Sequence, residues 1–254
     1  MRLLWLDYLA TLRERKTWLG VVMMAYAVLT MPIVLERPPE HVRHAIMTWF
    51  GAADPFVLFM YVWLDLAMNK IIAFLPVVMA SGVVLRERDS HVLPLLASKP
   101  LSMARYFAVR TLGVCGVVAT LHVGAQAVGA LWFSLRVPGF RVLPFAAAMS
   151  LHLFAALFAT ALAAAIGAWV KRRAASALVG FVVLNGLVGL ALVGFYQPAW
   201  RGVTMLNPIT LGSHAFAYLP SPGVSVLLAP MAGLACFTAV TIAVGALGVR
   251  RLEA

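Results

Sequence analysis

The chain has 254 residues, of which 63% are hydrophobic and 11% charged, and its formal net charge is +11. Soluble domains carry about 45–50% apolar and about 25% charged residues, so this composition excludes an ordinary soluble domain and predicts a chain solvated mostly by lipid. The basic residues cluster at the ends of apolar runs, which favours a role in membrane topology over nucleic-acid binding. Cys115 and Cys236 both lie within apolar runs, so no disulfide framework is expected.

The first element is an amphipathic helix over residues 1–16. Leu4, Tyr8 and Leu12 fall at helical spacing, and basic residues follow on the polar side. A helix of this kind lies along the membrane surface instead of crossing it.

Six apolar stretches are long enough to cross a bilayer, for which about 20 residues suffice. The predicted spans cover residues 17–35, 66–85, 106–133, 145–170, 175–195 and 226–249. Another apolar stretch, starting at Phe56, precedes the second span, so this element is either one long helix that tilts and protrudes or a span with an interfacial segment before it. The sequence therefore predicts an all-α membrane protein with a single transmembrane domain over residues 1–254.

Orientation follows from the distribution of Lys and Arg. They concentrate near the N-terminus, in residues 86–105, in residues 171–173 and at residues 250–251. Because cytoplasmic flanks carry the excess of positive charge, both chain ends are expected in the cytoplasm. Residues 36–55, 134–144 and 196–225 then face outward.

The segment over residues 86–105 carries the most information about function. It begins with charged residues and continues with leucines. The residues that would make its contacts are Glu87, Arg88, Asp89, Leu93, Leu95 and Leu96. Two interpretations stay open on physical grounds: a surface helix that buries its leucines in lipid, and a docking helix for a cytoplasmic partner. Ser102 is placed to cap the helix that follows.

This order of elements resembles the permease subunit of type-2 ABC transporters. After the second span that family often reads Glu-Arg, a Leu-Leu pair, Ser-x-Pro and an Arg. The matching residues here are Glu87-Arg88, Leu95-Leu96, Ser98-Lys99-Pro100 and Arg105. Ser90-His91 stands where the family usually has Gly-Thr, and Leu206-Asn207-Pro208-Ile209 resembles the turn before the last span. The topology resembles the family over nearly the whole chain, whereas the motif covers only this short segment.

The resemblance implies an elbow helix at the N-terminus and a coupling helix between spans two and three. In the family the coupling helix sits in a groove of a separate ATPase, which binds ATP and magnesium. This chain shows no GxxxxGK[ST] loop and is expected to hold no cofactor and no catalytic residue. The implied coupling residues are the six candidates above, with a second contact at Arg172 and Arg173. The resemblance also implies two permease copies, by default a homodimer, exporting a substrate from the bacterial inner membrane.

Polar side chains within the spans are candidates for a substrate path. They are Asp65, His122, Gln126, His152 and Asn185. Each can equally hydrogen-bond a neighbouring helix, which is the preferred interpretation for most of them. Asp65, Asn69 and Lys70 are expected at the outer end of span two, where Lys70 can snorkel to the headgroups. In the family, spans two and five border the dimer interface, so Asn185 is the strongest candidate.

Several alternatives stay open. The assembly could pass mechanical work to a periplasmic partner without moving a substrate, or the chain could be an ATP-independent channel or an intramembrane enzyme. The spans hold no paired acids and no HExxH motif, which argues against the enzyme. His41 and His44 would form a metal site only with further convergent ligands, so a polar outer loop is preferred and no metal is predicted.

Overall fold

A computed structural model describes residues 2–36, 40, 44, 47, 54–85, 102–170, 172–204, 206–213 and 224–251. The described residues form helices and no strand. In chain order the helices are α1 (Arg2–Leu12), α2 (Arg15–Glu36), α4 (Pro55–Val62), the π-helix η1 (Trp63–Met68), α5 (Asn69–Ala80), α8 (Met103–Arg136), α9 (Val142–Trp169), α10 (Arg173–Tyr196), the 3₁₀-helix η2 (Pro198–Trp200), α11 (Arg201–Thr204), α12 (Pro208–Ser213) and α13 (Val224–Arg250).

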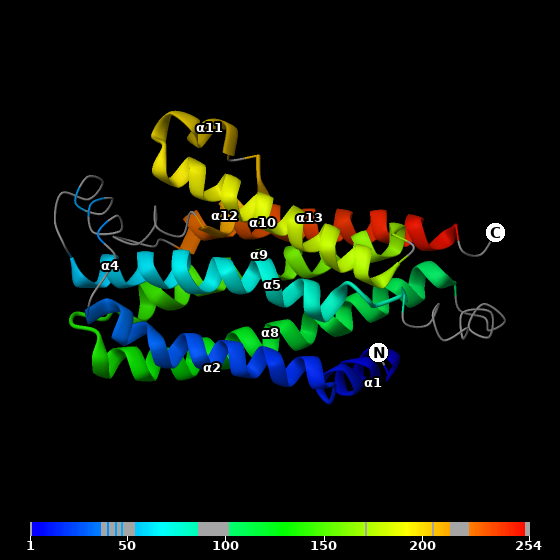
Figure 1. Cartoon of the computed structure of the whole chain (residues 1–254), viewed down its shortest axis with the longest axis horizontal. Helices are drawn as coiled ribbons and strands as arrows, with labels where there is room; N and C mark the ends of the chain where they lie inside the picture. Colours follow the sequence, from blue (N-terminus) through cyan, green and yellow to red (C-terminus); the bar gives the residue numbers. More distant parts are fainter. Residues whose placement is uncertain are drawn as a thin grey trace.

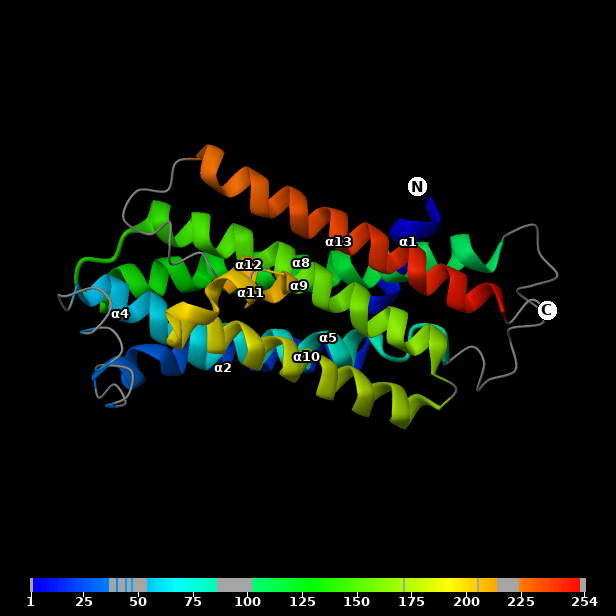
Figure 2. The ribbon, with the colours of Figure 1, turned by 90° about the horizontal axis from the view of Figure 1, so that it is seen from above.

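Six helical segments in the described part of the chain are long and apolar enough to cross a membrane. This confirms the predicted all-α membrane fold. The helices form two layers, with α2, α5 and α10 in front of α8, α9 and α13 in the view of Figure 1. Figure 2, turned by 90°, separates the two layers and shows α13 farthest from α2 and α10. The predicted spans other than the second coincide with α2, α8, α9, α10 and α13 to within a few residues.

The second span begins earlier than expected. The Asp54 carboxylate accepts a hydrogen bond from the Phe56 amide at 2.9 Å, and Pro55 occupies the first turn, which are two strong helix-start signals. The stretch from Phe56 therefore belongs to one continuous run, Pro55–Ala80, that is 26 residues long and mostly buried. Asp65, Asn69 and Lys70 consequently lie near its middle, which corrects their expected place at the outer end.

Aromatic rings fix the end of the bundle at which α4 starts. Phe59 lies 4.8 Å from Phe133 and 5.5 Å from Phe140 between ring centroids, which joins α4 to the turn between α8 and α9. The turn itself uses Gly139 at a φ of 67°, a left-handed conformation that glycine adopts without strain. Arg141 pairs with Asp54 at 2.6 Å and so links the start of α9 to the start of α4.

Small residues let the back layer pack closely. Ala155, Ala159 and Ala163 of α9 have no exposed surface. On α13, a Cβ added at Gly245 would overlap the Phe107 ring, so this helix can approach only with glycine there. Close approach of this kind is how membrane helices gain packing energy without a hydrophobic driving force.

Helix α12, between α10 and α13 in the chain, packs against the bundle. The Asn207 side chain donates to the Leu187 carbonyl at 2.6 Å and accepts from the Ile209 amide at 3.0 Å. It therefore caps α12 and ties it to α10 with one side chain. The motif around Pro208 thus forms a turn that holds a short helix against the spans.

Candidate functional site

The predicted coupling segment is bounded by two helices that the structure describes. Residues 86–101 lie outside the described residues, so the coupling roles of Glu87, Arg88, Asp89, Leu93, Leu95 and Leu96 remain predictions. The predicted cap is confirmed, because the Ser102 hydroxyl accepts a hydrogen bond from the Arg105 amide at 3.3 Å and α8 starts directly afterwards. The contacts at both flanks of the segment identify the helices that a movement of the segment would displace.

The start of α10 holds the upstream flank. The Ser176 hydroxyl donates to the Ser81 carbonyl at 3.1 Å, and both residues are buried. The Arg173 side chain lies against Gly82, with its Nε 3.2 Å from the point where a Cβ would stand. Arg172 is exposed beside it. Arg172 and Arg173 therefore lie next to the start of the predicted coupling segment, as a second contact would require.

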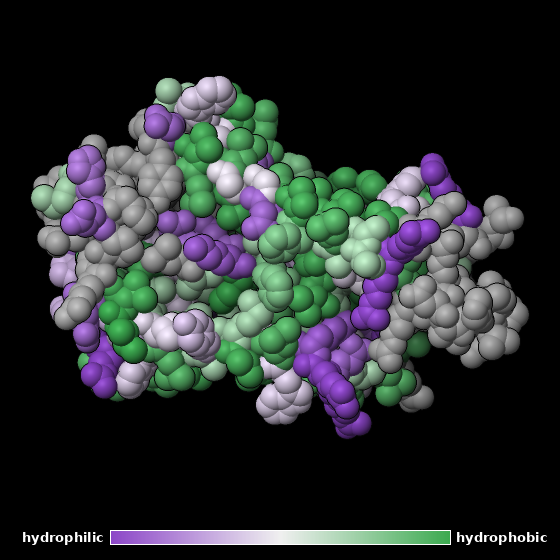
Figure 3. Space-filling view, viewed as in Figure 1, coloured by the Kyte–Doolittle hydropathy of each residue, from purple (hydrophilic) through white to green (hydrophobic). Residues whose placement is uncertain are grey.

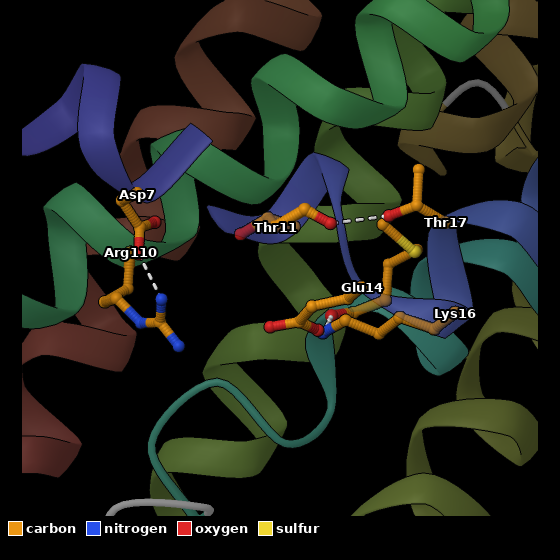
Figure 4. Close-up of polar contacts among 7 residues, drawn as sticks. Asp7, Thr11, Glu14, Lys16, Thr17 and Arg110 are labelled. Atoms are coloured by element: carbon orange, nitrogen blue, oxygen red, sulfur yellow. Dashed lines mark hydrogen bonds and ion pairs between the residues drawn. The ribbon is translucent and has the colours of Figure 1, made fainter. Parts of the chain in front are cut away.

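The N-terminal segment, formed by α1 and the start of α2, contacts both flanks (Figure 4). Asp7 of α1 forms an ion pair with Arg110 of α8, two turns after the downstream flank. Lys16, at the start of α2, donates to the Met79 carbonyl at 2.7 Å near the upstream flank and pairs with Glu14 at 3.1 Å. Burial raises the pKa of the Asp7 carboxyl, and the Arg110 hydrogen bond and charge oppose that shift.

The Asp7–Arg110 pair was missed by the sequence analysis, although the chain carried a signal for it. Asp7 is the one acid in an otherwise apolar stretch of α1, and Arg110 is a charge within a predicted span. Charges at such positions normally have a partner. Gly113 and Gly116 of α8 leave the space into which Asp7 and Tyr8 fit, and the Tyr8 hydroxyl lies 3.0 Å from that of Thr120.

Three predicted path residues meet inside the bundle. The His122 and His152 rings stack with centroids 5.5 Å apart, and both residues are buried. His122 Nε2 lies 3.1 Å from the Met149 carbonyl oxygen, and the Gln126 amide nitrogen contacts the Met68 sulfur at 3.4 Å. Among the described residues, neither ring nitrogen of His152 has a hydrogen-bond partner.

This buried cluster joins η1, α8 and α9 and borders a groove of about 240 Å³ between α8 and α9. His122 and Gln126 line the groove, whereas His152 is fully enclosed. The shared face predicted for His122 and Gln126 is confirmed by their common groove. Their contacts are those of helix packing, and their role in transport stays a prediction.

Asn185 and Lys70 occupy a different face. Both are exposed, on α10 and α5 respectively. The Asn185 amide donates to the Phe181 carbonyl one turn earlier at 2.8 Å, which is a bond within its own helix. Asp65 lies in η1, and π-helical segments occur frequently at functional sites.

The outer-loop histidines yield little. His41 lies outside the described residues, so a metal site with His44 stays untested. Among the described residues, no group of three or more His, Cys, Asp or Glu side chains could hold a metal ion.

Six apolar helical segments in the described part of the chain, packed in two layers, define a multi-pass membrane protein. A family model described as ABC-2 family transporter protein matches residues 70–247, well over half of the chain. The chain therefore belongs to the ABC-2 transporter family and is a type-2 ABC permease. No curated protein matches it. Members of this family are transmembrane components and generally not themselves catalytic.

Proposed function

We propose that this permease is the membrane subunit of an exporter driven by a separate ATPase that docks on residues 86–105. The observation that carries the proposal is the bracing of both flanks of this segment. The Lys16–Met79, Ser176–Ser81 and Asp7–Arg110 contacts connect the flanks to α2, α10 and α1. A displacement of the segment by an ATPase would therefore reach three helices directly, which is what coupling requires.

We further propose that two copies pair through the exposed side of α10. Asn185 is a polar group on the exposed side of α10, where Gly186 and Gly189 have open space around them. Polar side chains and glycines on one exposed helix face favour helix association in lipid. The start of α1 and the end of α13 lie at the same end of the bundle (Figure 1), which supports chain ends on one side, the cytoplasm of a bacterial inner membrane.

The docking proposal is tested by purification of the tagged permease from native membranes. We expect an ATPase to co-purify with the wild type and to be lost with the double variant Glu87→Lys, Leu96→Asp. The matched control, Glu36→Lys with Leu206→Asp, introduces the same changes at the opposite end of the bundle, where Leu206 is 81% exposed. Loss of the ATPase in both variants, or in neither, would contradict docking at residues 86–105.

The pairing proposal is tested by cross-linking in a background with Cys115→Ala and Cys236→Ala. Gly186→Cys on α10 should form a disulfide-linked dimer under mild oxidation in membranes. Val240→Cys on α13, which is 55% exposed on the other layer, should not. A dimer through the α13 position alone would place the interface on the opposite face.

A further inference from the structure

Lys70 is an exposed ammonium group near the middle of a membrane span. The run Pro55–Ala80 is about 39 Å long at 1.5 Å per residue, and Lys70 lies about 22 Å from its start and about 15 Å from its end. A lysine stem reaches roughly 6 Å, so the amine cannot snorkel to either interface. No described side chain or carbonyl pairs with this amine. Something outside the described residues must therefore solvate it.

A groove between α2 and α5 contains this amine. Its volume is about 430 Å³, within the range of ligand sites, and Tyr26 on its wall is 69% exposed. The Tyr26 and Thr30 side chains line it on α2, and Lys70 lines it on α5. The remaining lining is apolar, namely Met23, Ala27, Met31, Val34, Ala67, Ile71 and Phe74. One cation at mid-depth among apolar walls suits a ligand with one anionic group and a hydrocarbon part.

The neighbouring helix brings Asn185 to the same level. The α5 and α10 helices run antiparallel, since Arg173 lies against Gly82 at one end and Phe74 contacts Phe181 farther along, with centroids 6.3 Å apart. Lys70 precedes Phe74 by one turn, and Asn185 follows Phe181 by one turn. Because the two helices are antiparallel, both residues lie one turn beyond the ring pair, on an exposed strip shared by α5 and α10. Figure 3 shows hydrophilic side chains interrupting the apolar surface of this face.

The π-helix gives an independent indication. It ends at Met68, directly before Asn69 and Lys70. Such segments add about one residue to a helical turn and occur frequently at functional sites. Phe74 and Phe181, which are 40% and 41% exposed, bound the strip on the other side of Lys70.

We propose that the α2–α5 groove binds an anionic amphiphile, with Lys70 holding its phosphate or carboxylate and the apolar walls its chain. The ligand enters sideways from the bilayer, because the exposed Tyr26 places the groove at the surface of a membrane span. This inference rests on the proposed transport function and names the chemical class of the substrate.

The test uses the purified permease in phosphatidylcholine nanodiscs. A radiolabelled, photoactivatable lysophosphatidate is the probe, and the matched neutral probe is a photoactivatable monoacylglycerol. We expect lysophosphatidate to label peptides of α2 and α5, and Lys70→Gln to weaken this labelling ~10- to 100-fold, as for the loss of a charge-assisted hydrogen bond. Lys70→Arg, which keeps the charge, should stay within about threefold of the wild type.

Two controls separate this groove from general attraction of anions to a basic protein. Arg136→Gln removes a positive charge from a different groove, which lies between α2 and the Trp132–Arg136 end of α8, and should leave the α5 labelling unchanged. Soluble glycerol 3-phosphate should not compete, whereas unlabelled lysophosphatidate should. Competition by the soluble phosphate would show an aqueous anion site and overturn the amphiphile.

Three further results would overturn the inference. The first two are equal labelling by the neutral probe and unchanged labelling in Lys70→Gln. The third is labelling that appears only when the Gly186→Cys dimer is absent, because the second copy would then cover the Lys70 amine. None of them affects co-purification of the ATPase, so the inference can fail while the proposed function stands. Loss of ATPase docking with intact labelling would instead contradict the proposed function and leave a lipid site.

Discussion

Removing Arg110 should release the elbow helix. In Arg110→Met, the Asp7 carboxylate stays buried, since its side chain is only 8% exposed, but it loses the cation with which it pairs. Breaking a buried ion pair on one side costs about 3–5 kcal/mol, because an uncompensated charge remains. Asp7 can lower that cost by taking up a proton, at about 1.4 kcal/mol for each pKa unit, so we expect about 2–4 kcal/mol near pH 7.5.

The measurement combines the apparent melting temperature in detergent with hydrogen exchange of α1. At about 2–4 °C for each kcal/mol, the melting temperature should fall by ~4–16 °C, unless α1 detaches alone, in which case exchange over Leu3–Leu12 accelerates. Arg105→Met, an exposed arginine on the same helix, is the control and should do neither. The double variant Asp7→Asn, Arg110→Met should recover most of the loss, because no charge is left buried.

The loss of stability in Arg110→Met should become smaller as the pH falls. Burial raises the pKa of Asp7 in the fold, and removing Arg110 raises it further. A group with a raised folded pKa contributes stability that is complete below its unfolded pKa of 3.8 and is lost as pH rises through the folded value. The difference between Arg110→Met and wild type should therefore shrink from pH 8 to pH 5. An equal difference at both pH values, or none compared with Arg105→Met, would refute the buried pair.

Three other predictions concern packing and polar contacts, each measured as an apparent melting temperature. Gly245→Ala should destabilise by about 1–3 kcal/mol because its Cβ would overlap the Phe107 ring, whereas Gly124→Ala, with open space around it, should be neutral or slightly stabilising. His152→Leu should be neutral or stabilising, since its ring nitrogens have no partner among the described residues; loss of export without loss of stability would reveal a path role. Asn207→Ala should cost ~2 kcal/mol through its two hydrogen bonds, and an unchanged value would contradict its role in holding α12.

The sequence sufficed for the number, order and approximate ends of the spans, because about 20 apolar residues and flanking charges are strong signals. It was wrong about the depth of Lys70, since the apolar run from Phe56 to Leu85 is longer than a span and hydropathy alone does not say where the helix starts. The cap at Asp54 and Pro55 decided that point. Local hydrogen-bond chemistry was thus more informative here than hydropathy.

Which side chains meet was the harder question. In lipid a helix is apolar all round, so its hydrophobic pattern does not tell packed faces from exposed ones. The spacing placed His122 and Gln126 on one face but could not name Met149 or Met68 as their contacts. It also could not show that Asn185 faces outward while His152 is enclosed, because both are single polar residues in equally apolar helices.

The π-helix Trp63–Met68 has a consequence for chain length. One turn of a π-helix contains about one residue more than a turn of an α-helix, with the helix regular on either side. Deleting one residue between Trp63 and Met68 would restore a regular helix. Phe59 and Phe74 would keep their neighbours on the adjacent helices after only a local adjustment. A permease of this family with an uninterrupted second span should therefore be one residue shorter here, and an alignment should place a single-residue gap inside this segment and nowhere else in the span.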